Sequence, residues 1–368
     1  MLLFLSIFIV VYGLMHFYAF RKAWKAFPQS RVLMGSLILA GIALTIAPIL
    51  VRILERNDWH RLASVTAWSV YTWMGYLVVF FCIALIFDFG RGIATLLKMQ
   101  WKLNHVMTFR IVAIVTLAMV CYGFYEAQDI QIERITIKTP KLKSGSVTIA
   151  QISDLHLGVM IKDRYLRRVM TEVKALKPDL IVATGDIVDG QGDELNSLSQ
   201  YFHTYKPPHG TYAITGNHEY IVGIDHSLRF LLNAGFTMLR ADSVRTGGIV
   251  LVGVDDQSRM TPSKEAKTDV RKAMAAVTQD DFVILLKHKP IIDSDMAFDL
   301  QLSGHTHGGQ IFPFALPARL INGVPTGLIQ LGQGRQLYVS RGVGTWGPPI
   351  RLFSAPEIAL ITIESTNK

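Results

Sequence analysis

Cysteine is scarce in this chain of 368 residues, which has only Cys82 and Cys121. Both lie inside apolar runs, so we interpret them as small buried hydrophobic residues and expect no disulfide framework or thiolate metal site. Residues 130–368 also lack a large basic excess, because they hold 26 Lys and Arg against 23 Asp and Glu, and residues 1–129 supply +6 of the net charge of +9. This distribution argues against nucleic-acid binding, which needs basic residues on the folded domain that binds.

A cleavable secretory signal is missing as well. No basic residue precedes the apolar run Leu2–Phe20 and no clear small-x-small site follows it, so this run is expected to remain as a membrane anchor. Three further apolar runs follow, at Val32–Val51, Ser64–Phe87 and Ile111–Tyr125. About 20 apolar residues are needed to cross a bilayer, and the last run is shorter than that. The sequence predicts a membrane domain of about four transmembrane helices at residues 1–129.

Basic residues favour one orientation of these helices. The loops at 21–31 and 88–110 each carry four Lys or Arg, whereas the loop at 52–61 carries three beside two acidic residues. Cytoplasmic loops are enriched in Lys and Arg, so the first and third loops are expected in the cytoplasm. With four crossings of the inner or plasma membrane, the rest of the chain is extracytoplasmic; with three, it faces the cytoplasm.

From about Thr136 onward the pattern is that of a layered α/β domain, in which short β-branched runs alternate with amphipathic stretches. The expected strands are Val147–Ile152, Leu180–Thr184, Thr211–Thr215, Ile249–Val254, Phe282–Leu286, Leu300–Ser303, Leu328–Leu331, Leu337–Ser340 and Ile358–Ile363. The expected helices are Arg164–Leu176, Glu194–Thr204, Asp225–Asn233 and Lys264–Val277. We therefore predict a soluble domain at 146–368, joined to the membrane domain by a linker at 130–145.

Polar residues follow the ends of several predicted strands, where open α/β sheets place their sites. The candidate metal ligands are Asp154, His156, Asp186, Asn217, His288, His305 and His307. Side chains two positions apart in an extended segment point to one side, so each Asp-x-His or His-x-His pair can hold one ion. Carboxylate, amide and imidazole donors together suit Mn, Fe or Zn. The alternative is a set of strand-end groups that hydrogen-bond to the backbone, or, for His288, a surface histidine in a basic turn.

The order of these motifs resembles the calcineurin-like metallophosphoesterase family over residues 146–363, and the GHTHGGQ sequence at 304–310 is similar to its bacterial membrane-associated branch. The resemblance implies a four-layer αββα sandwich and two divalent metal ions. The residues that it assigns to the first ion are Asp154, His156, Asp186 and His307, with Asp186 bridging. Those that complete the second are Asn217, His288 and His305. It also implies that His218 is catalytic rather than a ligand, and that Asp189 orients it.

Three residues near the motifs have competing interpretations. Asp189 is equally suited to cap a turn or helix. Glu219 is left out of the catalytic set, because a salt bridge or solvation explains it as well as a contact to the site does. Arg341 lies in a glycine-rich stretch and suits a phosphate contact, but a packing role suits it equally.

Two neighbouring cations can activate water to hydroxide and clamp phosphoryl oxygens. The expected function is a membrane-anchored metal-dependent phosphoesterase that cleaves a phosphodiester or pyrophosphate bond in a phosphorylated small molecule, a lipid or a lipid-linked substrate. The expected partners are the bilayer and that substrate, without nucleic acid. The alternative is a non-catalytic module that binds metal or phosphate beside a sensory or transport unit. Within the apolar runs there are few polar or ionisable candidates for a transport site apart from Asp88 at the end of one run, which argues against transport.

Overall fold

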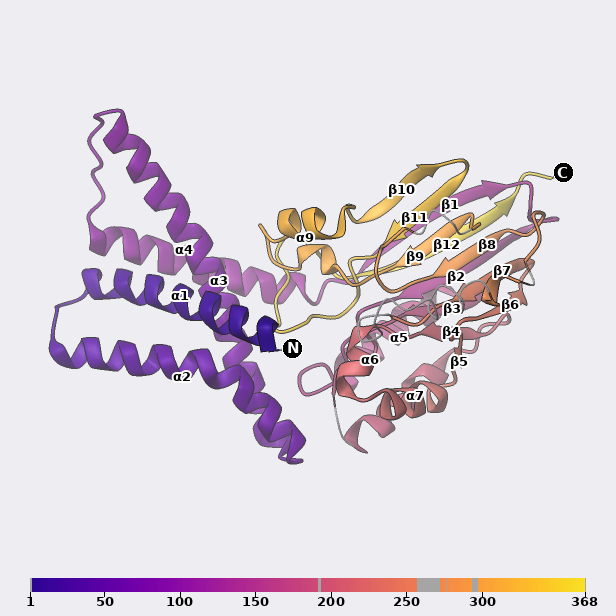
Figure 1. Ribbon diagram of the computed structural model, residues 1–368, viewed down its shortest axis with the longest axis horizontal. Helices are drawn as coiled ribbons and strands as arrows, with labels where there is room; N and C mark the ends of the chain where they lie inside the picture. The colour runs from indigo at the N-terminus through magenta and orange to yellow at the C-terminus, as the bar shows by residue number, and fades with distance from the viewer. Residues whose placement is uncertain (1, 191–192, 257–271, 276, 293–296, 368) are drawn as a thin grey trace. The chain divides into compact units, whose positions relative to one another are not determined.

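The chain forms two units in the computed structural model, which describes residues 2–190, 193–256, 272–275, 277–292 and 297–367. The first, here called the helical unit, contains Met1–Glu126 and Gly347–Leu352. The second, here called the sandwich unit, contains Ala127–Trp346 and Phe353–Lys368. Figure 1 shows the helices of the first and the two sheets of the second. A short segment near the C-terminus therefore belongs to the same unit as the N-terminal helices.

The described part of the helical unit contains four helices long and apolar enough to cross a membrane. They are α1 (Leu2–Ala26), α2 (Arg31–Arg56), α3 (His60–Leu96) and α4 (His105–Glu126). The run predicted at Ile111–Tyr125 lies within α4, which has 22 residues and is therefore about 33 Å long at 1.5 Å per residue. That length matches a hydrocarbon core of about 30 Å. The fourth helix is thus not too short to span.

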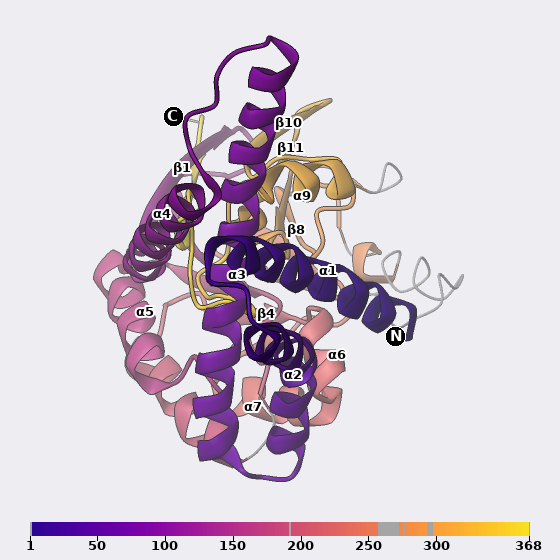
Figure 2. The same cartoon turned by 90° about the vertical axis from the view of Figure 1, so that its left-hand side faces the viewer.

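Polar contacts connect helices of this unit to one another and to its C-terminal segment, Gly347–Leu352. In Figure 2, α1 crosses α3, and the two helices are in contact. At this crossing the indole Nε1 of Trp73 donates a hydrogen bond to Nε2 of the buried His16, at 2.9 Å. The backbone N–H of Arg351 donates to the carbonyl oxygen of Gly123 in α4, at 3.0 Å. Residues 347–352 are therefore anchored on the helices by main-chain pairing.

The described residues of the sandwich unit form two six-stranded sheets. The first sheet runs β1 (Gln131–Thr139), β12 (Glu357–Ser365), β2 (Ser146–Ile152), β3 (Leu180–Thr184), β4 (Thr211–Ile214) and β5 (Thr237–Met238). The second runs β10 (Gly327–Gly332), β11 (Arg335–Val339), β9 (Leu300–Ser303), β8 (Val283–Leu286), β7 (Ile249–Gly253) and β6 (Asp242–Thr246). Strands β2, β3 and β4 are parallel, as are β7, β8 and β9. The parallel strands form the middle of each sheet.

Side chains alternate between the two faces of each strand and build separate cores. Ile149 and Val182 of the first sheet pack with Ile284 of the second in one buried cluster. Ala150 and Ile181 face the other way, into a cluster with α5 (Asp163–Leu176) and α7 (Ile224–Asn233). A third cluster covers the outer face of the second sheet. The predicted fold class, apolar N-terminal helices followed by an α/β sandwich, is confirmed.

Several local predictions need correction. The linker expected at 130–145 is wrong for its first half, because Gln131–Thr139 is strand β1 and pairs in parallel with β12 along nine residues. The stretch predicted as a helix at Glu194–Thr204 is the 3₁₀ segment η1 (Asp193–Thr204). Most of the helix predicted at 264–277 lies outside the described residues. The described elements that the sequence reading missed include α6 (Asn217–Val222) and α9 (Ala315–Asn322).

Candidate metal centre

Both sheets place their candidate ligands at the same end of the sandwich, after the C-terminal ends of their strands. Asp154 and Asp186 follow β2 and β3, and His288 and His305 follow β8 and β9. The backbone N–H of His305 donates to both carboxylate oxygens of Asp154, at 3.0 Å each. This bond joins the loop after β2 in one sheet to the loop after β9 in the other. Residues more than 130 positions apart in the chain thus share one site.

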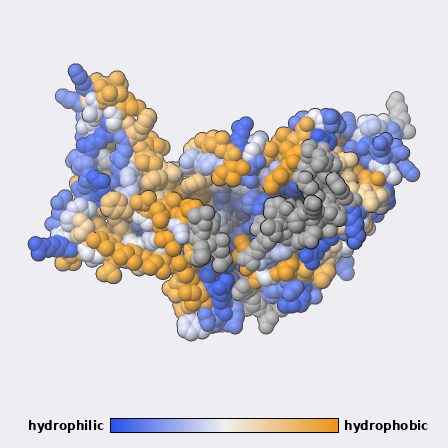
Figure 3. Space-filling model, viewed as in Figure 1, coloured by the Kyte–Doolittle hydropathy of each residue, from blue (hydrophilic) through white to orange (hydrophobic). Residues whose placement is uncertain are grey.

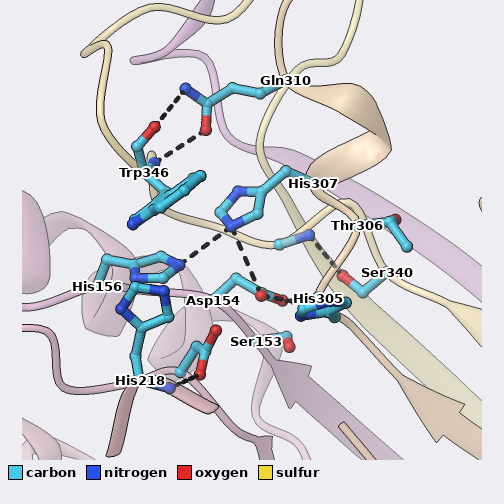
Figure 4. A network of polar contacts seen from close by, with 12 residues as sticks. Ser153, Asp154, His156, His218, His305, Thr306, His307, Gln310, Ser340 and Trp346 are labelled. Atoms are coloured by element: carbon cyan, nitrogen blue, oxygen red, sulfur yellow. Dashed lines mark hydrogen bonds and ion pairs between the residues drawn. The ribbon is translucent and has the colours of Figure 1, made fainter. Parts of the chain in front are cut away.

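The first donor cluster consists of Asp154, His156 and His307, all buried. The Nε2 atoms of His156 and His307 lie 3.1 Å apart, and Nε2 of His307 lies 3.6 Å from Oδ1 of Asp154. Figure 4 shows the three side chains pointing toward one another. Two ring nitrogens at this distance share at most one proton, so lone pairs converge where a cation would bind.

The second donor cluster consists of Asp186, His288 and His305. Nε2 of His288 lies 3.1 Å from Oδ2 of Asp186 and 3.2 Å from Nδ1 of His305. Nδ1 of His288 lies 2.8 Å from the carbonyl oxygen of Thr184. A proton on Nδ1 is thereby fixed, so Nε2 is the ring nitrogen that faces the site and could bind a metal in place of its proton. His288 is 1% exposed, so the surface-histidine alternative is wrong.

Burial and neighbouring charges shift the pKa values of the residues in the two clusters in opposite directions. Burial lowers the pKa of His288, but the carboxylates of Asp186 and Asp154 outweigh burial and raise it to about 10. Burial and the charge of His288 together lower the pKa of His305 to about 3. Burial raises the pKa of Asp154, whereas His288 holds the pKa of Asp186 below its usual range despite burial. A divalent cation would neutralise the negative charge of the two buried carboxylates and would accept the imidazole nitrogens as further ligands.

One buried polar atom at the site, Oδ1 of Asn217 at the start of α6, has no hydrogen-bond partner among the described residues. Buried polar groups are nearly always paired, so this atom needs another partner. A buried amide oxygen in this condition fits a metal site. The donor set therefore fits the divalent ions that the family resemblance implies.

His218 lies beside the first cluster without joining it. Its Nδ1 is 2.7 Å from Oδ1 of Asp189, and its ring packs edge-on against the rings of His156 and Trp346. Burial lowers the pKa of His218, but Asp189 outweighs burial and raises it to about 9. The protonated ring is therefore favoured near neutral pH. The other Asp189 oxygen lies 3.5 Å from Nδ1 of His156, so this carboxylate contacts two histidines of the site.

Glu219 has a larger structural role than its sequence position suggested. It is fully buried, and its two carboxylate oxygens accept hydrogen bonds from the backbone N–H groups of Asp186, Ile187, Val188 and Gly216, at 2.7–3.0 Å. The carboxylate therefore ties the loop after β3 to the start of α6. The two interpretations based on solvation and a salt bridge are wrong. The only sequence signal was its position three residues after Gly216, which is the spacing of a capping box.

The ligand loops have an unusual backbone. Asp154, His156, Asp186, His305 and His307 have φ between 49° and 73°, in the left-handed region. Non-glycine residues rarely adopt this conformation, and each instance costs on the order of 1–3 kcal/mol. The surrounding loops must hold these residues in place, and such strain is concentrated at functional sites.

Two glycines make room for the carboxylates. A Cβ on Gly216 would overlap Oδ1 of Asp186, and a Cβ on Gly304 would overlap Oδ2 of Asp154. The two aspartates therefore lie directly against backbone that carries no side chain. These are positions where only glycine permits so close an approach.

Gln310 and Trp346 are further residues that the sequence reading did not assign. Oε1 of Gln310 accepts the backbone N–H of Trp346 at 2.9 Å, and Nε2 donates to its carbonyl oxygen at 3.1 Å (Figure 4). This pair holds the indole of Trp346 beside His218. Arg341, a candidate phosphate contact, instead pairs with Glu133 of β1 and Glu357 of β12, at 2.5 and 2.6 Å. Its role in the described structure is to connect strands.

Comparison with known proteins agrees with this geometry. Residues 147–309 match the model of the calcineurin-like phosphoesterase family. A metallophosphoesterase of Aquifex aeolicus is 40% identical over 248 residues, which are 66% of this chain and 95% of the relative. One of Campylobacter jejuni is 27% identical over 99% of this chain and 98% of the relative. A zebrafish transmembrane protein with a metallophosphoesterase domain is 31% identical over 68% of this chain and 61% of the relative. The chain therefore belongs to the calcineurin-like phosphoesterase family of metal-dependent hydrolases, in a form with apolar N-terminal helices.

Proposed function

We propose that this protein is a membrane-anchored phosphohydrolase with two divalent metal ions, Mn, Fe or Zn, which cleaves a phosphodiester or pyrophosphate bond. The observation that supports it best is the pair of donor clusters, Asp154 with His156 and His307, and Asp186 with His288 and His305. The clusters are connected through the bond from His305 to Asp154. Asn217, with its unpaired buried oxygen, would complete the second site.

Bound ions would supply a water of lowered pKa and positive charge against the phosphoryl oxygens. The remaining chemistry belongs to side chains of the chain itself. His218 has Nδ1 held by Asp189, so Nε2 is the nitrogen that can donate a proton to the leaving oxygen or a hydrogen bond to the phosphoryl group. Its raised pKa keeps that proton in place near pH 7. Asp189 acts by orienting the ring and stabilising its charge.

We further propose that the substrate is a lipid or a lipid-linked molecule. Four helices long and apolar enough to cross a membrane precede the sandwich in the described chain. Tethering to the bilayer raises the effective concentration of the site toward membrane substrates. The basic loops at 21–31 and 88–110 support an extracytoplasmic sandwich. A reporter enzyme that is active only outside the cytoplasm, fused after Lys368, should then be active, and activity of a cytoplasmic reporter alone would reverse the orientation.

Turnover of a soluble diester tests the enzyme proposal directly. The full chain, purified in detergent and supplied with Mn²⁺, should hydrolyse bis-(p-nitrophenyl) phosphate. Asn217→Ala should lose both turnover and metal, whereas Asn233→Ala, on the exposed end of α7, is the matched control and should keep both. Parent protein that binds metal but turns over no diester with any of the three metals would favour the non-catalytic binding module.

The natural substrate calls for a cellular experiment. Lipids extracted from cells that carry the intact site should be compared with those from cells that carry Asn217→Ala. A phosphorylated lipid that accumulates only in the second strain would identify the substrate class. Unchanged lipid profiles together with turnover of the soluble diester would exclude the lipid part of the proposal.

A further inference from the structure

The sandwich unit concentrates its exposed apolar side chains in one region. Of twelve large hydrophobic side chains that are exposed in the described part of this unit, eight fall between residues 312 and 353. Leu320 and Ile321 of α9 are 83% and 82% exposed. Hydrophobic residues also gather over α9 in the space-filling view (Figure 3). The surfaces of soluble proteins seldom group large apolar side chains in this way unless the surface binds an apolar partner.

We name this region the α9 surface and define it by Phe312, Phe314, Leu316, Leu320, Ile321 and Phe353. No described residue of α9 is buried, so the helix does not use its apolar side chains to pack on the sandwich. Phe312 and Phe353 instead pack edge-on with ring centroids 6.0 Å apart. The two phenylalanines join residues from both ends of this region into one surface.

The single charged residue of α9 is basic. α9 contains Arg319 and no Asp or Glu, and residues 300–356 contain no acidic residue. Of the other arginines in this stretch, Arg351 is buried and Arg341 is paired with Glu133 and Glu357. An apolar helix with a basic residue and no acidic residue is typical of segments that lie in the interface of a membrane with anionic lipids. A surface for a soluble protein partner would usually carry both signs of charge at its polar rim.

The α9 surface is also continuous with the metal centre. His307 is followed within eight residues by Ala315, the first residue of α9. The carbonyl oxygen of His307 accepts a hydrogen bond from the Ser354 hydroxyl at 2.7 Å, directly after Phe353. Both ends of the α9 surface are thus attached to one ligand loop. A bilayer bound at this surface would therefore contact a segment that is attached to the loop carrying His307.

The connection between α4 and the sandwich unit is short. Only residues 127–130 separate the end of α4 from the start of β1, and four extended residues reach about 14 Å at most. We propose that the α9 surface inserts into the headgroup region of the bilayer and presents lipid phosphates to the metal centre. Contact with the bilayer does not depend on catalysis; the delivery of lipid substrate rests on the proposed function.

Depth-dependent quenching tests the contact without using activity. Cys82 and Cys121 are replaced by alanine, and Leu320→Cys is labelled with an environment-sensitive fluorophore in the full chain. The protein is reconstituted in phosphatidylcholine and phosphatidylglycerol vesicles that contain lipids with a nitroxide on the acyl chain. Leu232→Cys on α7, a leucine that is also exposed at 57%, is the matched control. The label at 320 should shift to the blue and be quenched, and the label at 232 should show neither effect.

Equal, water-like emission from both labels would overturn the proposal. So would a blue shift of the label at 320 that persists in detergent, depends on protein concentration and is not quenched by the nitroxide lipids. The second result would assign the surface to a contact between two copies of the chain. Both readouts stand even when no diester is hydrolysed, so failure of the contact and failure of the enzyme proposal are distinguishable.

Kinetics test the delivery of lipid substrate. In the variant Leu320→Glu/Ile321→Glu, the ratio of turnover of a phospholipid diester in vesicles to turnover of bis-(p-nitrophenyl) phosphate should fall about tenfold, which corresponds to about 1.4 kcal/mol of lost bilayer contact. Leu232→Glu should keep the parent ratio. An unchanged ratio in the double variant would refute delivery by the α9 surface.

Discussion

Replacement of Glu219 by alanine should destabilise the sandwich unit more than any surface substitution. The change removes one fully buried carboxylate and leaves the backbone N–H groups of Asp186, Ile187, Val188 and Gly216 without their acceptor. A buried donor left unsatisfied costs about 1–3 kcal/mol, so four of them cost about 4 kcal/mol or more even at the low end. For a domain of this size, that loss lowers Tm by about 8–16 °C.

The assay is thermal unfolding of the full chain in detergent after metal has been removed with a chelator, because bound metal would add its own stabilisation. Glu172→Ala on α5, a half-exposed glutamate, is the control and should leave Tm within a few degrees of the parent. Glu219→Gln keeps one carbonyl oxygen as an acceptor and should fall between the two. If Glu219→Ala unfolds at the parent temperature, the four hydrogen bonds do not hold the loops together and the reasoning is wrong.

Three further substitutions test the site. Asp186→Ala should remove both ions and nearly all turnover. His218→Ala should keep its metal, measured by elemental analysis, while kcat falls about 10²–10⁴-fold. Metal loss in the second variant would make His218 a ligand. Asp189 raises the pKa of His218, and an acid catalyst loses its proton as pH rises through its pKa. Asp189→Asn should therefore move the alkaline limb of the kcat profile to lower pH. An alkaline limb that stays in place would assign that limb to another group. Gly304→Ala should displace Asp154 and weaken metal binding, and an unchanged metal affinity would show that the loop adapts.

Much of the architecture could be predicted because its signals are local. The run Leu180–Ala183 is continuously apolar and, with Thr184, forms β3, which is buried along its whole length. The apolar runs of the N-terminal third became helices for the same reason. Strand β1 was missed because Gln131–Thr139 mixes charged and apolar residues, and its pairing partner β12 begins more than 200 positions later. Nothing near residue 131 in the sequence records that partner.

The candidate ligands were recognisable from the sequence because metal-binding side chains are few in type and their short motifs lie where predicted strands end. What the sequence alone determined is therefore the kind of chemistry and the residues able to perform it. Only the tertiary structure decided that Glu219 holds two loops together, that Arg341 joins strands, and that Gln310 places Trp346 beside His218. These roles depend on which backbone groups meet across the fold, and the sequence of a segment does not specify its distant neighbours.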